Sequence, residues 1–366
     1  MAKLRFIADR GVHLPSYFLW DDAISKFCKT EDFAFLADRF GYLNQFTRID
    51  AAAIDEGKFP SSGSVITFDT CMVSRAADIA RRCSLQGCNC YVLWSGGCDS
   101  TGVVAALIDA GMDRRHIKVL YTKSSTLEFP EFMQFMTAAS IETIQVSYAE
   151  LFSKALVQAA DGDLVVTGFP ADQLFGSIIG QLFPGDTTKT HWTEYLKSDK
   201  ANQQYEAAFE YYGLPVKTVA EFLWFNNFAL KWDYVCYPGL MMVNKTHHNI
   251  IPFYNTPEFQ AWSVSNFDIL HRYDQKDPTN YKVQMKDYIF SVTKLQAVYS
   301  LKKVPSLAYA AEAEALIELP KSITLSGIDD AEHVTTVDVP IKSQLHTMMG
   351  TAGLAAAQIM RRYLKK

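Results

Sequence analysis

Long apolar segments are missing from this 366-residue chain, and so is an excess of positive charge. No apolar run approaches the roughly 20 residues that a membrane-spanning helix needs. The formal net charge is −5, whereas a protein that binds nucleic acid without sequence preference is usually basic. We therefore expect no membrane insertion and no bulk binding of nucleic acid. Charged side chains occur too early near Met1 for a secretory signal peptide, so we expect a cytoplasmic protein.

Cysteine is also scarce, with seven residues, and the number is odd. Seven thiols in so long a chain do not suggest a disulfide framework. Cys83, Cys88 and Cys90 lie close together in the sequence, but they lack the C-x-x-C pairing that is typical of metal and Fe–S sites. We therefore expect reduced, structural thiols, with a metal centre or a relay of sulfur as the alternatives.

The remaining composition is ordinary for a globular protein with a sizeable core, with 49% hydrophobic and 20% charged residues. The length suits one large α/β domain with a smaller part attached. Short apolar runs alternate with stretches of helical periodicity in the first half of the chain. This alternation predicts an α/β fold in which a parallel, twisted sheet has helices on both faces. We expect strands at 90–94, 117–121, 143–147 and 163–167, and helices at 71–87, 100–110, 128–140 and 149–160.

Strand signals fade beyond residue 180, and residues 1 to about 70 show little periodicity. Helical stretches at 200–235 and 256–302 predict a C-terminal helical lobe. Short strands are expected within 320–340, and a last helix at 354–366. Four aromatic side chains of the lobe are expected to pack in its core, or alternatively to close over a reactive site: Trp224, Phe225, Trp232 and Tyr234.

The segment S-G-G-C-D-S at 95–100 joins the first of these strands to its helix. Gly96 and Gly97 allow backbone N–H groups to approach a ligand closely, and the helix that follows directs its free N–H groups to the same place. The hydroxyls of Ser95, Ser100 and Thr101 add further donors. The segment therefore predicts a loop that binds phosphate, although it has neither the G-x-x-x-x-G-K-[ST] nor the G-x-G-x-x-G pattern.

Asp99 lies inside this loop, where a carboxylate beside phosphates needs an explanation. A Mg²⁺ ion that bridges Asp99 to phosphate oxygens would supply one. The alternative is an ordinary Gly-Gly turn in which the aspartate caps the helix.

Three segments resemble the N-type ATP pyrophosphatases, a superfamily with the adenine nucleotide alpha hydrolase-like fold. The loop at 95–100 resembles their pyrophosphate loop. The segment V-V-T-G-F-P-A-D-Q-L-F-G at 165–176 resembles V-x-S-G-E-G-x-D-E-L-F-G of asparagine synthetase. The segment I-P-F-Y-N-T-P-E-F at 251–259 resembles the P-F-L-D segment of the same family. The resemblance covers about residues 85–305 and is closest to the synthetase domain of asparagine synthetase.

The resemblance implies ATP and Mg²⁺ as cofactors, with Asp99 and Asp172 as metal ligands. Asp172 also follows a predicted parallel strand, at the edge where ligands bind in such sheets, although it could simply cap the next helix. The end of the strand at Leu120 would contact adenine through its backbone. Lys302 or Lys303 would neutralise charge on pyrophosphate and act in catalysis, or alternatively form a solvated pair. The residues implied to surround the nucleotide are Ser95, Gly96, Gly97, Asp99, Ser100, Thr101, Leu120 and Gly168.

The match to asparagine synthetase is incomplete. Phe169 stands where the family has a glutamate, Gln173 replaces a second glutamate, and Asn255 replaces an aspartate. Ala2 follows Met1, so the cysteine nucleophile of a glutaminase is not there, and only 94 residues precede the loop. We therefore expect no glutaminase in this chain, and nitrogen from free ammonia, a partner protein or an amine.

These observations predict an ATP-dependent carbon–nitrogen ligase that adenylates a carboxylate or carbonyl and releases pyrophosphate. One alternative is an enzyme that modifies a nucleobase or tRNA base by transfer of nitrogen or sulfur. Another is a non-catalytic nucleotide-binding relative, which Phe169 would favour. We divide the chain into an N-terminal region of unknown role at 1–80, a synthetase domain at 81–305 and a C-terminal extension at 306–366.

Overall fold

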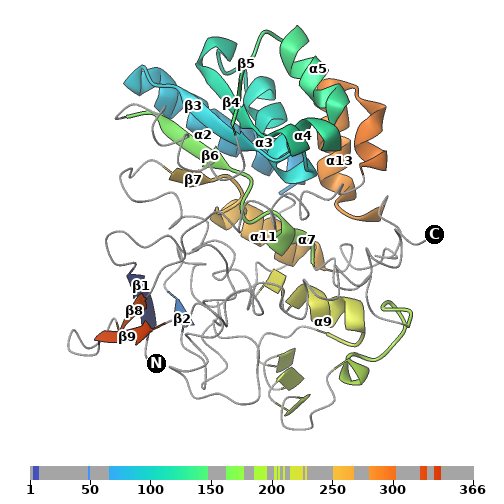
Figure 1. Cartoon of the computed structure of the whole chain (residues 1–366). Coiled ribbons are helices and arrows are strands. Elements are labelled where there is room, and N and C mark those ends of the chain that lie inside the picture. The colour runs from blue at the N-terminus through green and yellow to red at the C-terminus, as the bar shows by residue number, and fades with distance from the viewer. Residues whose placement is uncertain are drawn as a thin grey trace.

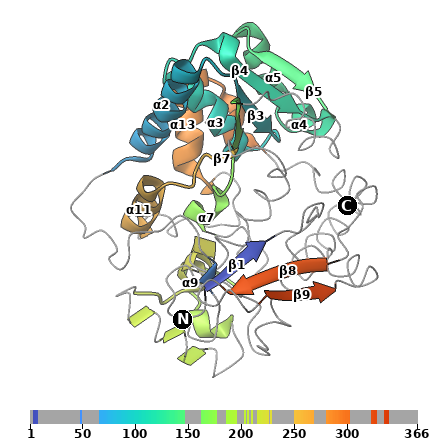
Figure 2. The same ribbon diagram turned by 90° about the vertical axis from the view of Figure 1, so that its left-hand side faces the viewer.

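The described residues of the protein form two separate β-sheets, one of five strands and one of four (Figure 1). In both views the four-stranded sheet lies away from the five-stranded sheet (Figures 1 and 2). The computed structural model describes residues 3–7, 48–49, 66–146, 162–176, 185–195, 202–203, 205–206, 209–210, 215–225, 227–228, 250–267, 280–301, 322–327 and 334–338.

The five-stranded sheet is parallel throughout and has the strand order β5-β4-β3-β6-β7. Its strands are β3 (Cys90–Trp94), β4 (Ile117–Tyr121), β5 (Glu142–Gln145), β6 (Leu164–Thr167) and β7 (Ile250–Pro252). Every residue of β3 is buried, which explains its uninterrupted apolar sequence. The predicted α/β fold with a parallel sheet is therefore confirmed, as are the four expected strands, while β7 was not predicted.

The order of the strands reverses beside β3. The chain runs outward from β3 through β4 to β5, and then returns to the other side of β3 to form β6. Ligands of parallel α/β sheets bind at the carboxyl ends of the strands beside such a reversal. The crevice between the ends of β3 and β6 is therefore the first place to look for a site.

Three helices pack together, and both views show them side by side (Figures 1 and 2). They are α2 (Phe68–Gln86), α3 (Cys98–Asp109) and α13 (Val283–Thr293). Of these, α3 packs directly against β3 and β6. Helix α2 begins after Thr67, whose hydroxyl accepts a bond from the N–H of Thr70, and ends at Gly87 in the left-handed conformation. The Trp94 side chain joins strand and helix, because its indole N–H donates to the Thr101 hydroxyl of α3 at 2.9 Å.

The helix expected at 128–140 is α5 (Pro130–Ala138), and a short helix that was not predicted, α4 (Lys123–Glu128), precedes it. Phe129 separates them with a φ of −140° and a ψ of 73°, which is outside the helical region. Proline fits the first turn of a helix but disfavours a helical conformation at the residue before it. The helix expected at 149–160 lies outside the described residues.

The predicted helical content after residue 200 is confirmed at α9 (Val219–Phe225), α11 (Pro257–Ser265) and α13. Trp224 and Phe225 are buried, as expected of core aromatics, whereas Trp232 and Tyr234 lie outside the described residues. The Trp192 ring, in the short 3₁₀ helix η3 (Trp192–Glu194), stacks on Phe222 of α9 with 5.4 Å between the ring centroids. Short helical segments also occur at η1 (Arg114–His116), α7 (Asp172–Phe175) and η6 (Gln296–Ser300).

The four-stranded sheet joins two distant parts of the chain in the order β2-β1-β8-β9. Its strands are β1 (Lys3–Ile7), β2 (Arg48–Ile49), β8 (Ser322–Gly327) and β9 (Val334–Asp338). The short strands expected within 320–340 are confirmed, and β8 pairs antiparallel with β1, which was not predicted. The boundary drawn at residue 80 falls inside α2, and the helix expected at 354–366 lies outside the described residues.

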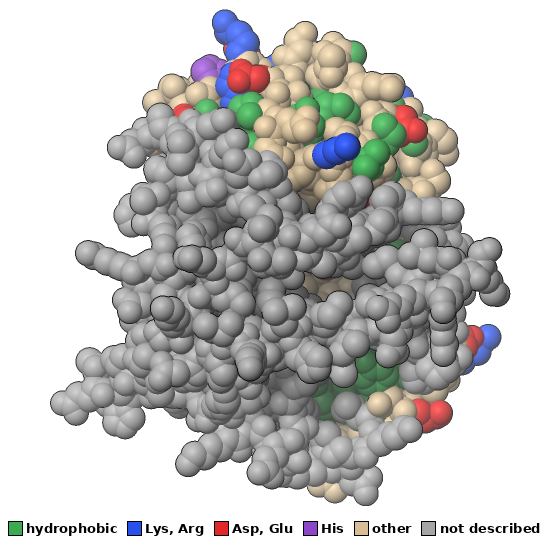
Figure 3. Space-filling model, viewed as in Figure 1, with side chains coloured by type: hydrophobic (Ala, Val, Ile, Leu, Met, Phe, Trp, Pro, Cys, Tyr) green, Lys and Arg blue, Asp and Glu red, His purple; other side chains and the backbone are tan. Residues whose placement is uncertain are grey.

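Two features of the described part bear on membranes and nucleic acid. None of its helices combines the length and the apolar character needed to cross a bilayer. On the face seen in Figure 3, its exposed basic and acidic side chains are scattered rather than gathered into one basic patch.

Candidate functional site

The predicted phosphate-binding loop connects β3 to α3 at the carboxyl edge of the five-stranded sheet. The helix begins at Cys98, and the residue that caps it is Gly97, without a side-chain cap bond. Asp99 is therefore not the capping residue of α3, although it lies in the first turn of that helix. The Ser100 hydroxyl oxygen accepts a hydrogen bond from the Ser95 N–H at 3.0 Å and lies 3.1 Å from the Ser95 hydroxyl. These bonds fold the loop over the first turn of α3.

Gly96 lets the loop lie tightly against α4. Its φ is +89°, and a Cβ atom there would come within 2.6 Å of the Ser125 carbonyl oxygen. Ser125 in turn donates its hydroxyl to the Trp94 carbonyl at 2.9 Å. Any other residue at this position would strain the backbone, and its Cβ atom would clash with a backbone atom, so the position requires glycine.

Gly168 lets the end of β6 approach the same turn. A Cβ atom at Gly168 would lie 2.9 Å from the Ser100 nitrogen and 3.1 Å from the Asp99 carbonyl carbon. The end of β6 is therefore in close backbone contact with the first turn of α3, at the reversal of strand order.

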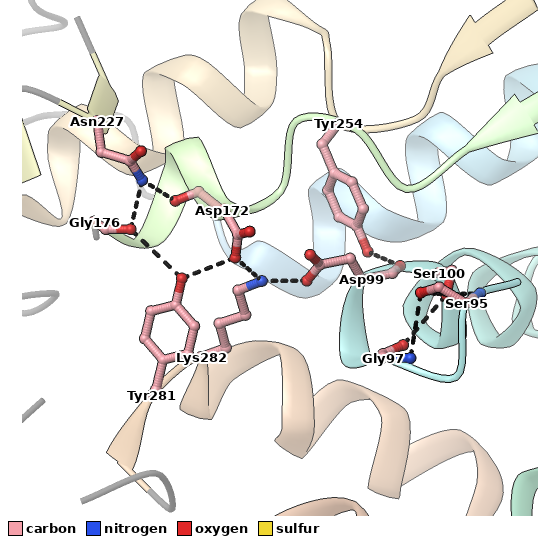
Figure 4. Close-up of polar contacts among 10 residues, drawn as sticks. All are labelled: Ser95, Gly97, Asp99, Ser100, Asp172, Gly176, Asn227, Tyr254, Tyr281 and Lys282. Atoms are coloured by element: carbon pink, nitrogen blue, oxygen red, sulfur yellow. Dashed lines mark hydrogen bonds and ion pairs between the residues drawn. The ribbon is translucent and has the colours of Figure 1, made fainter. Parts of the chain in front are cut away.

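Asp99 and Asp172 meet at a lysine that the sequence analysis did not identify (Figure 4). The Lys282 Nζ forms ion pairs with an Oδ1 atom of both carboxylates. The Lys282 side chain is only 6% exposed, compared with 27% for Asp99 and 44% for Asp172. Asp172 is the first residue of α7, which is capped by Ala171 without a side-chain bond, so the interpretation of Asp172 as a helix cap is wrong.

The two carboxylates keep the lysine charged. Burial alone would lower the pKa of Lys282, but the charges of Asp172 and Asp99 outweigh it and raise the pKa well above its usual value. Tyr281 donates its hydroxyl to the Asp172 Oδ1 at 2.9 Å. Burial, followed by the charge of Asp172, raises the pKa of Tyr281 well above its usual value, so the phenol remains a donor.

Further polar side chains fix the backbone around both aspartates. The Asn227 amide donates to the Asp172 carbonyl at 2.6 Å and to the Gly176 carbonyl at 2.5 Å. Gln173 donates its own amide to the Asn227 Oδ1 at 3.1 Å. Tyr254, which follows β7, donates its hydroxyl to the Asp99 carbonyl at 2.9 Å. The segment at 251–259 thus contributes through Tyr254, while Gln173 serves to anchor α7.

The donor set suits Mg²⁺, which prefers carboxylate oxygens and completes its shell with water and phosphate oxygens. Asp99 and Asp172 converge on one point, where a single cation already contacts both. Within the described residues, no group of three or more His, Cys, Asp or Glu side chains is arranged to hold a metal. The two aspartates therefore fit a metal that arrives with further ligands from phosphate, rather than an all-protein metal cage.

Two other buried charges lie near the loop and were not predicted. A Cβ atom at Gly97 would be 3.4 Å from the Glu128 Oε1. Lys286 is 3% exposed and lies one helical turn after Lys282 on α13. Besides burial, which raises the pKa of the Cys98 thiol in the loop, the charges of Lys282 and Lys286 lower this pKa and the charge of Glu128 raises it. In the sequence, Lys282 and Lys286 are four positions apart, a spacing that places two side chains on the same face of a helix.

The structure brings most of the predicted residues together. Thr101 differs in that it is fully buried and its hydroxyl accepts from Trp94, which makes it a core contact. Leu120 is buried in β4, one residue before the end of that strand at the same edge of the sheet. Lys302 and Lys303 lie outside the described residues. The residues at the meeting point of β3, β6 and α3 are Ser95, Gly96, Gly97, Asp99, Ser100, Gly168 and Asp172.

The cysteine cluster lies at the other end of the sheet. The Cys83 carbonyl accepts from the Cys88 N–H at 3.1 Å, and Cys90 is the first residue of β3. Hydrogen bonds from the thiols of Cys90 and Cys88 lower the pKa of Cys83. All three thiols are free and buried, as expected of structural cysteines. The length of β3, about 17 Å for five residues, separates them from the loop.

No model of a known protein family matches the sequence, and no curated protein does either. The resemblance to the ATP pyrophosphatases therefore depends on the three short segments quoted above.

The Cys98 thiol gives a test of the environment of the loop. Burial raises the pKa of Cys98 to about 11, which outweighs the usual lowering of a thiol pKa at a helix N-terminus. We expect alkylation of Cys98 to be slow at neutral pH and to accelerate about tenfold per pH unit up to that pKa, because the thiolate is the nucleophile. Mass spectrometry of the peptide that contains Cys98, after timed iodoacetamide treatment, measures this rate. A rate that levels off near pH 8 would contradict the buried environment.

Proposed function

We propose that this chain is an ATP-dependent, AMP-forming ligase of the N-type ATP pyrophosphatase kind, with the adenine nucleotide alpha hydrolase-like fold. The observation that carries the proposal is the convergence of Asp99 and Asp172 on one cation beside the S-G-G loop. A phosphate-binding loop alone would not need two carboxylates, and placing them together is costly unless a cation is shared. Lys282 is the shared cation in this structure, and a site for a metal–triphosphate complex would account for the loop together with the two carboxylates.

The position of the site in the fold supports the same proposal. The loop follows β3 and Asp172 follows β6, so both lie at the carboxyl edge where the strand order reverses. The first turn of α3 offers free backbone N–H groups to an anion at this point. The loop is therefore suited to bind the phosphates, with Asp99 and Asp172 as the residues that would hold Mg²⁺.

When bound, Mg²⁺ would offset the negative charge of the triphosphate and polarise its phosphorus–oxygen bonds. The backbone of the loop would orient the phosphates, while Tyr281 and Asn227 would keep Asp172 in place. The buried ammonium of Lys282 would supply positive charge where pyrophosphate develops negative charge. These groups would thus bind and orient the nucleotide.

The proposed reaction has two steps. A carboxylate oxygen of the substrate attacks the α-phosphorus of ATP, and the bond to the bridging oxygen breaks with its electron pair leaving on pyrophosphate. A nitrogen nucleophile then attacks the acyl carbon, and AMP leaves with the electron pair of the carbon–oxygen bond as the nitrogen loses a proton. Ammonia, an ammonia-supplying partner or an amine substrate would provide that nitrogen. We also propose that the enzyme acts in the cytoplasm, in keeping with its free thiols.

Incubation with Mg-ATP and panels of carboxylates, amines and nucleobases tests the proposal. We expect AMP and pyrophosphate in equal amounts, and no product from α,β-methylene-ATP, whose α–β bridge cannot be cleaved. Release of ADP and phosphate, or failure to bind ATP at all, would overturn it. Nucleotide binding without turnover on any panel would favour a non-catalytic relative.

Substitution of the cysteine cluster distinguishes amide formation from sulfur transfer. Replacing Cys83, Cys88 and Cys90 by alanine should leave pyrophosphate release unchanged within about twofold, because the thiols lie at the opposite edge of the sheet. Alanine keeps these buried positions apolar. Thermal unfolding of the variant, measured beside the pyrophosphate assay, controls for loss of folded protein. A folded variant that no longer modifies its acceptor would indicate a sulfur relay.

A further inference from the structure

The point on which Asp99 and Asp172 converge is occupied by a side chain of the protein itself (Figure 4). The ammonium of Lys282 stands where the proposed metal would stand. We propose that Lys282 acts as a substitute cation, so that a divalent metal enters this site only together with a polyphosphate. The inference rests on the proposed function, since it concerns the same two carboxylates.

Lys282 is held in place by its surroundings. It has a left-handed backbone conformation with a φ of 58° and a ψ of 40°, and it directly precedes α13, which packs against α3. The Asp172 Oδ1 that contacts its ammonium also accepts the hydrogen bond from Tyr281. With 6% exposure, the Lys282 side chain has little contact with water that could replace these partners. The pairing is thus built into the fold.

The charges explain why a metal alone would bind poorly. Two carboxylates and one ammonium leave a single net negative charge, which gives a divalent ion little reason to enter. The buried ammonium of Lys282 would also repel the ion, and the ion would have to share the carboxylates with that ammonium. If the ammonium moved into water, it would lose its ion pairs with both carboxylates. The lysine therefore competes with the metal for the same oxygens.

A triphosphate changes this balance. Its phosphate oxygens complete the shell of the metal and give the ammonium new anionic partners beside the loop. The flexible four-carbon stem of lysine allows the Nζ to move while the backbone of Lys282 stays fixed. Metal and nucleotide should therefore bind with positive coupling, each raising the affinity of the other by the same factor.

The test measures the affinity of the full chain for Mn²⁺. Electron paramagnetic resonance reports the concentration of the free ion. We expect wild-type protein to bind Mn²⁺ with α,β-methylene-ATP and to bind it at least about tenfold more weakly without nucleotide. In the variant Lys282→Met, the two carboxylates lose their ammonium, and we expect the affinity for Mn²⁺ alone to rise at least about tenfold. Lys282→Asn, whose residue tolerates the left-handed conformation, is the second variant.

Lys294→Met is the matched control. Lys294 lies at the other end of α13, also has a positive φ of 61°, and donates its Nζ to the Ser291 carbonyl at 2.6 Å. This exposed lysine should leave the binding of Mn²⁺ unchanged. The same substitution on the same helix thus separates the effect of the site from that of helix stability.

The outcomes distinguish the two proposals. Wild-type protein that binds Mn²⁺ equally well with and without nucleotide would overturn the role of Lys282 but leave the proposed function standing. Folded Lys282→Met and Lys282→Asn variants without gain in affinity for Mn²⁺ would also overturn it. If no nucleotide binds, the proposed function fails, while a gain of Mn²⁺ affinity in the variants would still support Lys282 as a substitute cation.

Discussion

Replacement of Asp99 by asparagine is expected to reduce pyrophosphate release from ATP at least about 100-fold, the loss typical of removing a group that stabilises charge in a transition state. Asparagine keeps the shape of the side chain but removes the charge that would bind the metal. It also takes from Lys282 one of its two carboxylate partners. Steady-state pyrophosphate release with Mg-ATP, together with Mn²⁺ binding in the presence of nucleotide, measures the loss.

The folded state should survive this change. Lys282 retains Asp172, and Tyr254 binds the backbone carbonyl of residue 99, which asparagine preserves. We expect the free energy of unfolding to fall by about 1–3 kcal/mol, less than for a fully buried pair, because the Asp99 side chain is 27% exposed. Asp113→Asn is the control, since this aspartate pairs with Arg115 before β4, at the opposite edge of the sheet. Unchanged turnover in Asp99→Asn would contradict the assignment of the loop.

The parallel sheet could be predicted because its strands carry their own signal. β3, β4 and β6 are short, strongly apolar and buried, and each is followed or preceded by a helical pattern. Strand β7 has three residues, too few for any periodicity, so its pairing with β6 becomes apparent only in the structure. Conversely, Pro130 was a visible reason to end a helix before residue 130.

The pairing of strand β1 could not be predicted because its partners are distant in sequence. Leu4 pairs with Gly327 in the antiparallel ladder between β1 and β8. The alternation of polar and apolar residues over Lys3-Leu4-Arg5-Phe6 is typical of a strand. Pairing across most of the chain, however, has no signature in either segment alone. The sequence therefore divided residues 1–80 from residues 306–366, although their strands share a sheet.

The site shows the same division between local and distant information. Asp99 and Asp172 could be predicted because each follows a strand within a recognisable short segment. Lys282 comes from the start of α13, 183 positions after Asp99, where no such segment precedes it. The family resemblance implied a late lysine at 302–303, whereas the ion pairs of the structure place Lys282 between the two aspartates.

Gly168→Ala is expected to weaken both folding and nucleotide binding. Its Cβ would lie 2.9 Å from the Ser100 nitrogen, 3.1 Å from the Asp99 carbonyl carbon and 3.2 Å from the Ser100 Cα. All three are backbone atoms, so no side-chain rotation can relieve the contact, and the first turn of α3 must move away from β6. We expect unfolding free energy to fall by about 1–3 kcal/mol, as in other overpacked sites. Nucleotide affinity should fall at least about tenfold, because Asp99 and the loop would move with that turn.

Gly111→Ala distinguishes damage to the site from loss of stability. Gly111 has a φ of +72°, and a Cβ there would meet nothing within 4 Å. Alanine at this position should cost about 1–2 kcal/mol of backbone strain, measured by denaturant unfolding, and leave nucleotide affinity unchanged by calorimetry. If Gly168→Ala lowers stability but binds nucleotide as tightly as Gly111→Ala, the contact between β6 and α3 is structural only. A loss of affinity confined to Gly168→Ala would instead indicate that this contact sets the position of Asp99 relative to Asp172, on which the proposed metal–triphosphate site depends.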